Sequence, residues 1–144
     1  MNKSYIDWNQ VEKLISRLSY WITTSDLEFE NIYGLQRGGL IPAVMLSHKL
    51  GIPMTKGDIG PNTLIVDDIC DSGETLDKFV EKHQTLYSFP FNLKTAVLHY
   101  KPHTSCFEPT FYVRDWVENN WIVYPWERED SKPIQDYKNL GWNL

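Results

Sequence analysis

The sequence has little of what exported, membrane-spanning or nucleic-acid-binding proteins need. It holds only two cysteines, Cys70 and Cys106, and its polar start lacks a signal-peptide pattern, so we expect reduced thiols in a cytoplasmic protein. No apolar stretch approaches the length of a membrane span, and no membrane partner is expected. With 14 Lys and Arg against 19 Asp and Glu, the net charge of −5 argues against a broad nucleic-acid surface.

The chain has enough apolar material for one folded domain. Its 144 residues are 42% hydrophobic and 14% aromatic, which fits a single domain over residues 1–144 with a substantial core. The tail from Glu127 onward is polar and poorly patterned, and no element is predicted there.

Apolar spacing predicts helices that alternate with strands. Asp7 and Gln10 form a capping box, after which an apolar stripe at helical spacing predicts an N-terminal helix within about residues 1–28. Two more helices are expected, one with Pro42 in its first turn and one around residues 76–83. Strands are predicted at 29–35, 63–66, 95–100, 111–113 and 121–124. This alternation favours an α/β fold with a mainly parallel sheet.

Two adjacent carboxylates follow the strand predicted at 63–66. Charges such as those of Asp67 and Asp68 are costly to bury unless they are paired, solvated or bound to metal. The next turn is rich in small donors and opens onto a helix, whose first amides can bind an anion; these donors are Ser72, Gly73 and Thr75. Together they indicate a sugar phosphate and a divalent metal. Alternatively, the acids only solvate a strand end and Asp71 caps the next helix.

A glycine-rich turn separates an earlier strand from the second helix. Gly38 and Gly39 let the backbone approach an anion closely, and Arg37 can donate to its oxygens. A tight turn without a ligand is the alternative. An RNA-binding tract is not expected, because such tracts repeat in disordered polar sequence and this turn is embedded in apolar structure.

Two later segments combine a lysine with aromatic side chains. Lys101 ends a predicted strand and can donate to an exocyclic oxygen, while Trp121 can stack on a flat heterocycle. Trp121 and Trp126 are equally suited to packing in the core or against the tail.

The stretch from Thr63 to Leu76 resembles the phosphoribosyl-pyrophosphate signature of type I phosphoribosyltransferases: an apolar run, two acids, two residues, an acid, Ser or Thr, Gly, any residue and Thr. The resemblance implies that Asp67 and Asp68 contact the ribose hydroxyls directly or through Mg²⁺. It places Asp71 near the purine N7, as a general acid or base or as an electrostatic partner. The loop that it implies for the 5′-phosphate comprises Cys70, Ser72, Gly73, Glu74 and Thr75.

The glycine-rich turn resembles the pyrophosphate loop of purine phosphoribosyltransferases. This implies that Arg37 and Gly38 bind pyrophosphate and that the Gln36–Arg37 peptide is cis. The segments at 98–102 and 120–127 resemble xanthine–guanine phosphoribosyltransferases. There the matching lysine reads the 6-oxo group, the tryptophan stacks on the purine, and main chain reads the 2-substituent; the matching residues are Lys101, Trp121 and Ile122.

The resemblance runs from the N-terminal helix to about Glu127 and implies a twisted parallel sheet flanked by helices, with a small hood and tail over about 101–144. It implies purine salvage: transfer of phosphoribose to guanine, xanthine or hypoxanthine by a homodimer or homotetramer. The substrates would be phosphoribosyl pyrophosphate and a nucleobase.

The sequence departs from this family at the mobile loop. In the family this loop is long and often carries a Ser-Tyr pair. Here it comprises only residues 54–62, it has no Ser-Tyr pair, and Lys56 is its sole cation. This difference puts turnover in question more than binding. Two alternatives therefore stay open: a non-catalytic phosphoribosyl-pyrophosphate-binding regulator, and a transferase for a different nucleobase. A plain partner-binding domain would leave the signature unexplained. The sequence does not choose among the purine bases.

Overall fold

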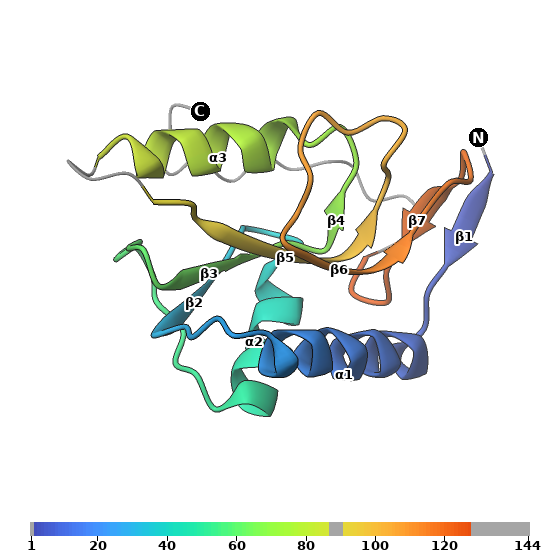
Figure 1. The fold of residues 1–144 in the computed structure, drawn as a ribbon. Coiled ribbons are helices and arrows are strands. Elements are labelled where there is room, and N and C mark those ends of the chain that lie inside the picture. The colour runs from blue at the N-terminus through green and yellow to red at the C-terminus, as the bar shows by residue number, and fades with distance from the viewer. Residues whose placement is uncertain (1, 87–90, 128–144) are drawn as a thin grey trace.

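A five-stranded parallel sheet lies between two layers of helices in the computed structural model, which describes residues 2–86 and 91–127 (Figure 1). Two helices cover one face of the sheet and the third helix covers the other, which confirms the predicted α/β architecture. Each face packs its own apolar cluster against these helices. The elements are β1 (Lys3–Tyr5), α1 (Trp8–Thr24), β2 (Asn31–Gly34), α2 (Leu40–Leu50), β3 (Thr63–Val66), β4 (Ile69–Cys70), α3 (Glu74–Gln84), β5 (Lys94–Tyr100), β6 (Phe111–Asp115) and β7 (Trp121–Val123).

The first two helices begin and end where local sequence signals predict. In the capping box before α1, Asp7 Oδ1 accepts from the Gln10 N–H, and Gln10 Oε1 accepts from the Asp7 N–H, both at 2.8 Å. The predicted apolar stripe of α1 is buried: Val11, Leu14, Ile15, Leu18 and Ile22. Helix α2 ends at Gly51, whose φ of +68° lies in the left-handed region that glycine tolerates best.

From the sequence we expected the chain to leave the sheet at the acidic pair. Instead, it continues along β5 after the acids. Val66 is paired with Ala96 of β5, and Ile69 is paired with His99, so β3 and β4 share one register along β5. Main-chain bonds bridge the interval: Asp67 N–H donates to the Ala96 carbonyl at 3.0 Å. On the other side of β3, β2 ends opposite Val66, so β2 does not extend beside the acids.

Two short strands escaped the sequence analysis. β4 spans only two residues. β1 lies near the start of the chain and pairs in parallel with β7, which is far from it in the sequence, with Lys3 opposite Trp121. Neither carries a local pattern long enough to predict a strand. Their pairing partners supply the stabilisation, and β1 thereby fixes the backbone at Trp121.

The short segment before β3 lies at the opposite end of that strand from the acidic pair. Asn62 accepts from the Glu30 N–H at 2.9 Å, just before β3 begins at Thr63. Four residues of strand, at about 3.3 Å each, separate this segment from Asp67 by about 13 Å. Residues 128–144, which include most of the poorly patterned tail, lie outside the described residues. Within the described part, no helix has the length and apolar character needed to cross a membrane.

Candidate active site

The acidic pair lies against the glycine-rich turn. A Cβ on Gly38 would lie 2.8 Å from Cγ of Asp68, and one on Gly39 would lie 2.9 Å from Cα of Asp67. Both distances are too short for a side chain, so only glycine lets the turn approach the acids this closely. The peptide before Arg37 is cis, as predicted. The two motifs, about thirty residues apart in the sequence, therefore form one continuous site.

Burial raises the pKa of both acidic side chains. For Asp67, the charge of its neighbour raises the pKa further. For Asp68, the carboxylate of Glu127 adds to the effect of burial. Each carboxylate accepts one main-chain bond, Asp67 from the Asp68 N–H at 2.9 Å and Asp68 from the Ile69 N–H at 2.8 Å. Neither forms an ion pair within the described residues, so a bound cation would offset the repulsion between the two carboxylates.

The predicted phosphate loop joins β4 to α3 and presents main-chain donors. Within the described residues, no protein acceptor takes the N–H groups of Ser72, Gly73 and Thr75. Gly73 has a φ of +79°, and a Cβ there would lie 2.8 Å from the Phe107 nitrogen, so both conformation and space require glycine. The Glu74 side chain is exposed in the first turn of α3, which leaves the amides open to an anion.

Cys70 belongs to this loop but its side chain is turned into the protein. Its Sγ lies 3.3 Å from Oγ of Ser105, and burial raises the thiol pKa to about 11. The group is a packed thiol rather than a nucleophile. Any contact of Cys70 with a ligand would come from its main chain.

A small cavity brings the predicted catalytic and base-binding residues together. It measures about 80 Å³, and its lining includes Asp68, Asp71, Lys101, Trp121 and Ile122. Lys101 Nζ lies 3.4 Å from Asp71 Oδ2 and donates to the Asn120 carbonyl at 3.3 Å. An adjoining cavity of about 200 Å³ shares Asp71, Lys101 and Trp121. These three side chains therefore stand between the acidic pair and an open space.

The two tryptophans singled out in the sequence have different environments. Trp121 is 41% exposed and lines both cavities, so its ring is available for stacking. Trp126 stacks on Tyr124 at 4.8 Å and contacts Trp8 at 5.9 Å, which makes it a packing residue. The two sequence interpretations thus apply to one residue each.

Sequence reasoning missed several side chains around the site. The Tyr124 hydroxyl donates to the Asp68 carbonyl at 3.2 Å and lies 2.7 Å from Nδ1 of the buried His99. Thr104 donates to Asp71 Oδ1 at 2.9 Å and so helps to orient that carboxylate. Glu127 lines the small cavity of about 80 Å³ and accepts from the Tyr124 N–H at 3.0 Å. Their roles depend on tertiary packing, for which no spacing in the sequence gives a signal.

Not all predicted residues line this cavity. Arg37 is exposed on the glycine-rich turn, and Ser72, Glu74 and Thr75 lie exposed at the start of α3. Among the described residues, no group of three or more His, Cys, Asp or Glu side chains is placed to hold a metal ion. The candidate metal ligands are Asp67 and Asp68 alone. Such a pair suits Mg²⁺, which usually takes one or two carboxylates together with substrate oxygens and water.

Comparisons with known proteins place this geometry among phosphoribosyltransferases. No family model matches the chain. A xanthine-guanine phosphoribosyltransferase of Gluconobacter oxydans is 26% identical, over 90% of this chain and 85% of the relative. A purine phosphoribosyltransferase from Pyrococcus horikoshii superposes with a TM-score of 0.76 at 33% identity, covering 93% of this chain and all of that one. A xanthine-guanine-hypoxanthine phosphoribosyltransferase of Helicobacter pylori, at 20% identity and a TM-score of 0.74, covers 99% of both chains and supports the fold.

Proposed function

This chain belongs to the purine phosphoribosyltransferase family, and on that premise we propose that it transfers the 5-phosphoribosyl group of phosphoribosyl pyrophosphate to a 6-oxopurine base. The products would be a nucleoside monophosphate and pyrophosphate, as purine salvage requires. The observation that carries this proposal is the cavity in which Asp68, Asp71, Lys101, Trp121 and Ile122 meet. Through Asp68, this cavity would connect the acidic pair to a stacking surface with a hydrogen-bond donor.

The acidic pair and the two loops would bind phosphoribosyl pyrophosphate. The free amides of Ser72, Gly73 and Thr75 would hold its 5′-phosphate. Asp67 and Asp68 would hold the ribose hydroxyls and Mg²⁺, a cofactor whose chemistry would be to neutralise charge on the pyrophosphate. The turn at Arg37 and Gly38, which lies against Asp68, would contact the leaving group.

The base would enter beside Lys101. The ammonium group, now held 3.4 Å from Asp71 and 3.3 Å from the Asn120 carbonyl, is placed to donate to a 6-oxo group. The exposed ring of Trp121 would stack on the purine, and main chain at Ile122 would meet the 2-position. The present cavity of about 80 Å³ is small for a ligand, so Lys101 and Trp121 must shift toward the adjoining cavity as the base binds.

Asp71 would manage the proton of the base during transfer. Its side chain is held by Thr104 on one oxygen and by Lys101 on the other, so the carboxylate has a fixed orientation toward the cavity. As the glycosidic bond forms, a purine nitrogen must lose a proton, and a carboxylate near N7 can accept or share it.

A panel of bases tests this proposal and identifies the substrate. The protein is incubated with Mg²⁺ and phosphoribosyl pyrophosphate and with guanine, xanthine, hypoxanthine, adenine or uracil, and nucleotides are identified by mass. We expect nucleotides from one or more of the three 6-oxopurines and far lower rates with adenine. A nucleotide formed from uracil or adenine alone would make the protein a transferase for a different base.

A further inference from the structure

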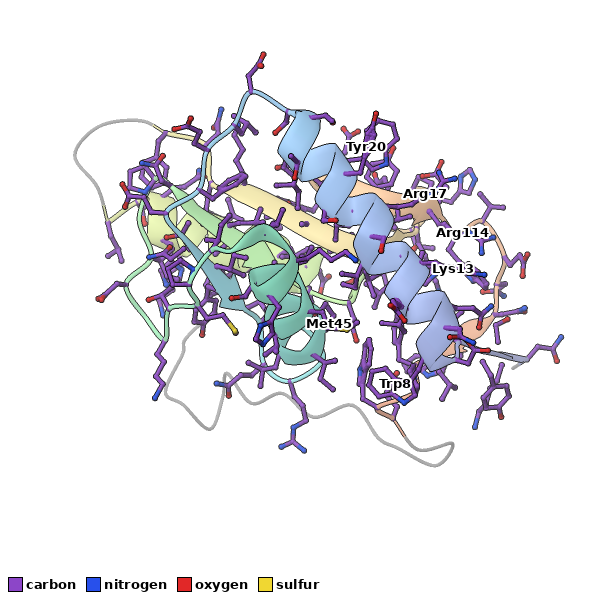
Figure 2. All side chains as sticks on the ribbon, turned by 90° about the horizontal axis from the view of Figure 1, so that it is seen from below. Trp8, Lys13, Arg17, Tyr20, Met45 and Arg114 are labelled. Atoms are coloured by element: carbon purple, nitrogen blue, oxygen red, sulfur yellow. The ribbon has the colours of Figure 1, made fainter. Side chains whose placement is uncertain are left out.

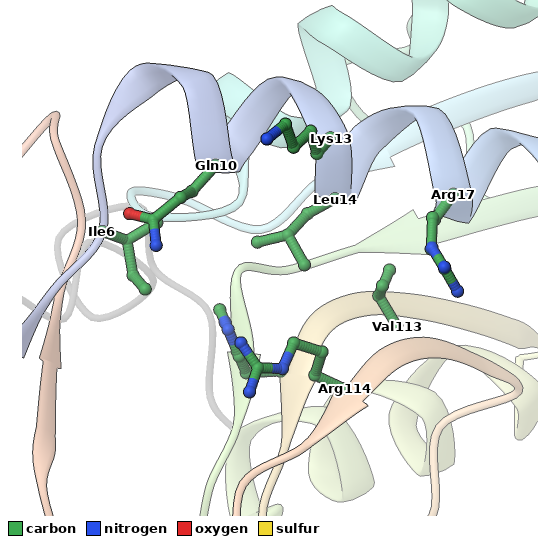
Figure 3. A pocket seen from close by; sticks show the side chains of 8 residues that line it. Ile6, Gln10, Lys13, Leu14, Arg17, Val113 and Arg114 are labelled. Carbon is green, nitrogen blue, oxygen red and sulfur yellow. The ribbon is translucent and has the colours of Figure 1, made fainter.

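A further cavity opens between α1 and β6, apart from the two cavities around Lys101 (Figure 3). Its volume is about 400 Å³, and none of its lining residues lines either cavity around Lys101. Small-ligand pockets usually measure about 300–1,000 Å³, so this one is large enough to hold a ligand. The proposed reaction makes no use of it.

Three cationic side chains line this cavity. Lys13 and Arg17 come from α1 and Arg114 comes from β6, and all three lie along one edge of α1 in Figure 2. No described Asp or Glu side chain lines the cavity, and none of the three cations forms an ion pair within the described residues. Lys13 and Arg17 are four residues apart on one helix, a spacing at which like charges repel. In a chain of net charge −5, this local concentration of positive charge indicates an anionic ligand.

A buried ring nitrogen completes the set of donors. His99 is 0% exposed and lines the cavity, and its Nε2 has no hydrogen-bond partner among the described residues. Its Nδ1 lies 2.7 Å from the Tyr124 hydroxyl. Buried polar atoms without partners are rare in native proteins. An oxygen of a bound ligand would give this nitrogen the partner that the protein does not supply.

A solvated basic face would explain Lys13, Arg17 and Arg114, all three of which are exposed, but it leaves the rest of the cavity unexplained. Such a face needs neither a hollow of this size nor a buried imidazole at its base. The lining also contains aliphatic side chains beside the cations: Ile6, Leu14 and Val113. A lining that combines cations with aliphatic side chains is typical of a site for a phosphate attached to an organic group.

We propose that this cavity binds a small phosphorylated molecule, with Lys13, Arg17 and Arg114 around its phosphate and Nε2 of His99 as a further donor. Guanidinium groups bind phosphate oxygens in pairs of parallel hydrogen bonds, which suits the two arginines on facing elements. The aliphatic side chains would cover the organic part. Inorganic phosphate has the same anionic group and would contact the cations without the aliphatic side chains.

A hydrogen-bond chain connects this cavity with the acidic pair. The Tyr124 hydroxyl lies 3.2 Å from the Asp68 carbonyl and 2.7 Å from Nδ1 of His99, and its single proton can serve only one of them, so the ring tautomer decides which bond forms. A phosphate oxygen at Nε2 requires a proton there. The neutral ring then has a bare Nδ1, to which the Tyr124 hydroxyl donates in place of Asp68. Occupancy would thereby alter the support beneath the acids, a consequence that rests on the proposed function.

Nitrogen NMR of protein labelled at histidine tests the proposal directly, because the two ring tautomers have different ¹⁵N shifts. The probes are GMP and inorganic phosphate, titrated without phosphoribosyl pyrophosphate. We expect addition of GMP to shift the ring ¹⁵N signals of His99 and to leave the ring proton on Nε2, and inorganic phosphate to cause the same change only at higher concentration. Equal potency of the two would make free phosphate the natural occupant. No change of the His99 signals with either probe would overturn the proposal.

Matched variants separate this cavity from the catalytic site, where GMP is also expected to bind. The double variant Arg17→Gln/Arg114→Gln loses two charged donors. The GMP concentration at which the His99 ¹⁵N signals have shifted halfway should therefore rise by about tenfold or more. Lys49→Gln/Lys78→Gln makes the same change in net charge at exposed positions of α2 and α3 and should leave it unaltered. An unaltered response in the arginine variant would refute the proposal. The titration needs no turnover, so its result is independent of whether the transferase activity is found.

Discussion

At the scale of single residues, the proposed chemistry depends on Asp71 and Lys101, whose charged ends lie 3.4 Å apart. The sequence could name both, because each occupies a position in a recognisable motif. It could not show that they contact each other, or that Thr104 holds the carboxylate. Residues far apart in the chain meet only through the tertiary fold, and single-residue motifs do not encode that distance.

Replacing Asp71 by Asn should reduce turnover more than binding. The variant keeps the shape of the side chain but loses the group that accepts the base proton, so we expect kcat to fall by about 10²–10⁴-fold. The dissociation constant of phosphoribosyl pyrophosphate, measured by calorimetry, should change little. Asp77→Asn makes the same chemical change on exposed α3 and serves as the control. Full activity in Asp71→Asn would remove this residue from the mechanism.

Replacing Lys101 by Ala should weaken binding of the base. One charged hydrogen bond to the 6-oxo group is lost, so the Michaelis constant for 6-oxopurines should rise about tenfold or more. Steady-state kinetics at saturating phosphoribosyl pyrophosphate measures this. The Michaelis constant for phosphoribosyl pyrophosphate is the internal control and should stay within about twofold. If the constant for the base is the same as in the wild type, Lys101 does not read the purine.

His99 should make the protein less stable in mild acid. Burial, and then the charge of Arg114, lower its pKa from 6.5 to about 4. Between these values the unfolded chain binds a proton that the folded protein does not, so acidification favours unfolding. From pH 7 to pH 5 the loss is about 2 kcal/mol. The raised pKa values of Asp67 and Asp68 act in the opposite direction, so the wild type must be compared with His99→Gln.

Urea unfolding at pH 7 and at pH 5 measures the effect. The stability difference between the two proteins should shift by about 2 kcal/mol in favour of His99→Gln at the lower pH. A difference that does not depend on pH would show that His99 titrates normally in the folded protein.

At the scale of elements, the site depends on two glycine-containing turns that fit tightly against other segments. Local signals predicted both turns, the helices that follow them and the strands that precede them. They did not predict that β4 would continue the register of β3 along β5, since that pairing is decided by the partner strand. The acids therefore lie in the two-residue interval between β3 and β4, beside the end of β2, and the chain returns to the sheet directly after them.

Gly38→Ala tests the contact between the glycine-rich turn and the acidic pair. A methyl group there would lie 2.8 Å from Cγ of Asp68, so the turn or the carboxylate must shift. We expect activity to fall by about tenfold or more while the fold is kept, because a displacement of about 1 Å in a reactive geometry costs up to about 10²-fold. Circular dichroism and a thermal melt check the fold.

Gly57→Ala is the matched control for that variant. Nothing lies within 4 Å of a Cβ at Gly57, which is in the segment before β3. Activity there should remain near that of the wild type. Equal activity in Gly38→Ala and Gly57→Ala would mean that close packing of the turn against Asp68 is not needed.

At the scale of the whole molecule, the sheet collects the ligand-binding segments at one end and leaves the 54–62 segment at the other. The sequence showed that this segment is short, and the structure adds that it lies about 13 Å along β3 from the acids. The chain's first residues instead approach the base pocket, where β1 pairs with β7 beside Trp121. Such pairing joins the two ends of the described chain, which local patterns cannot predict.

The most direct test of the central claim follows pyrophosphate release and nucleotide formation in one reaction of guanine, Mg²⁺ and phosphoribosyl pyrophosphate. We predict that GMP and pyrophosphate form in equal amounts and that neither forms at a comparable rate without the base. Xanthine and hypoxanthine are tested in the same way. If calorimetry shows that the protein binds phosphoribosyl pyrophosphate and yet no purine yields a nucleotide, the protein is not a transferase for these bases and the non-catalytic regulator becomes the better interpretation.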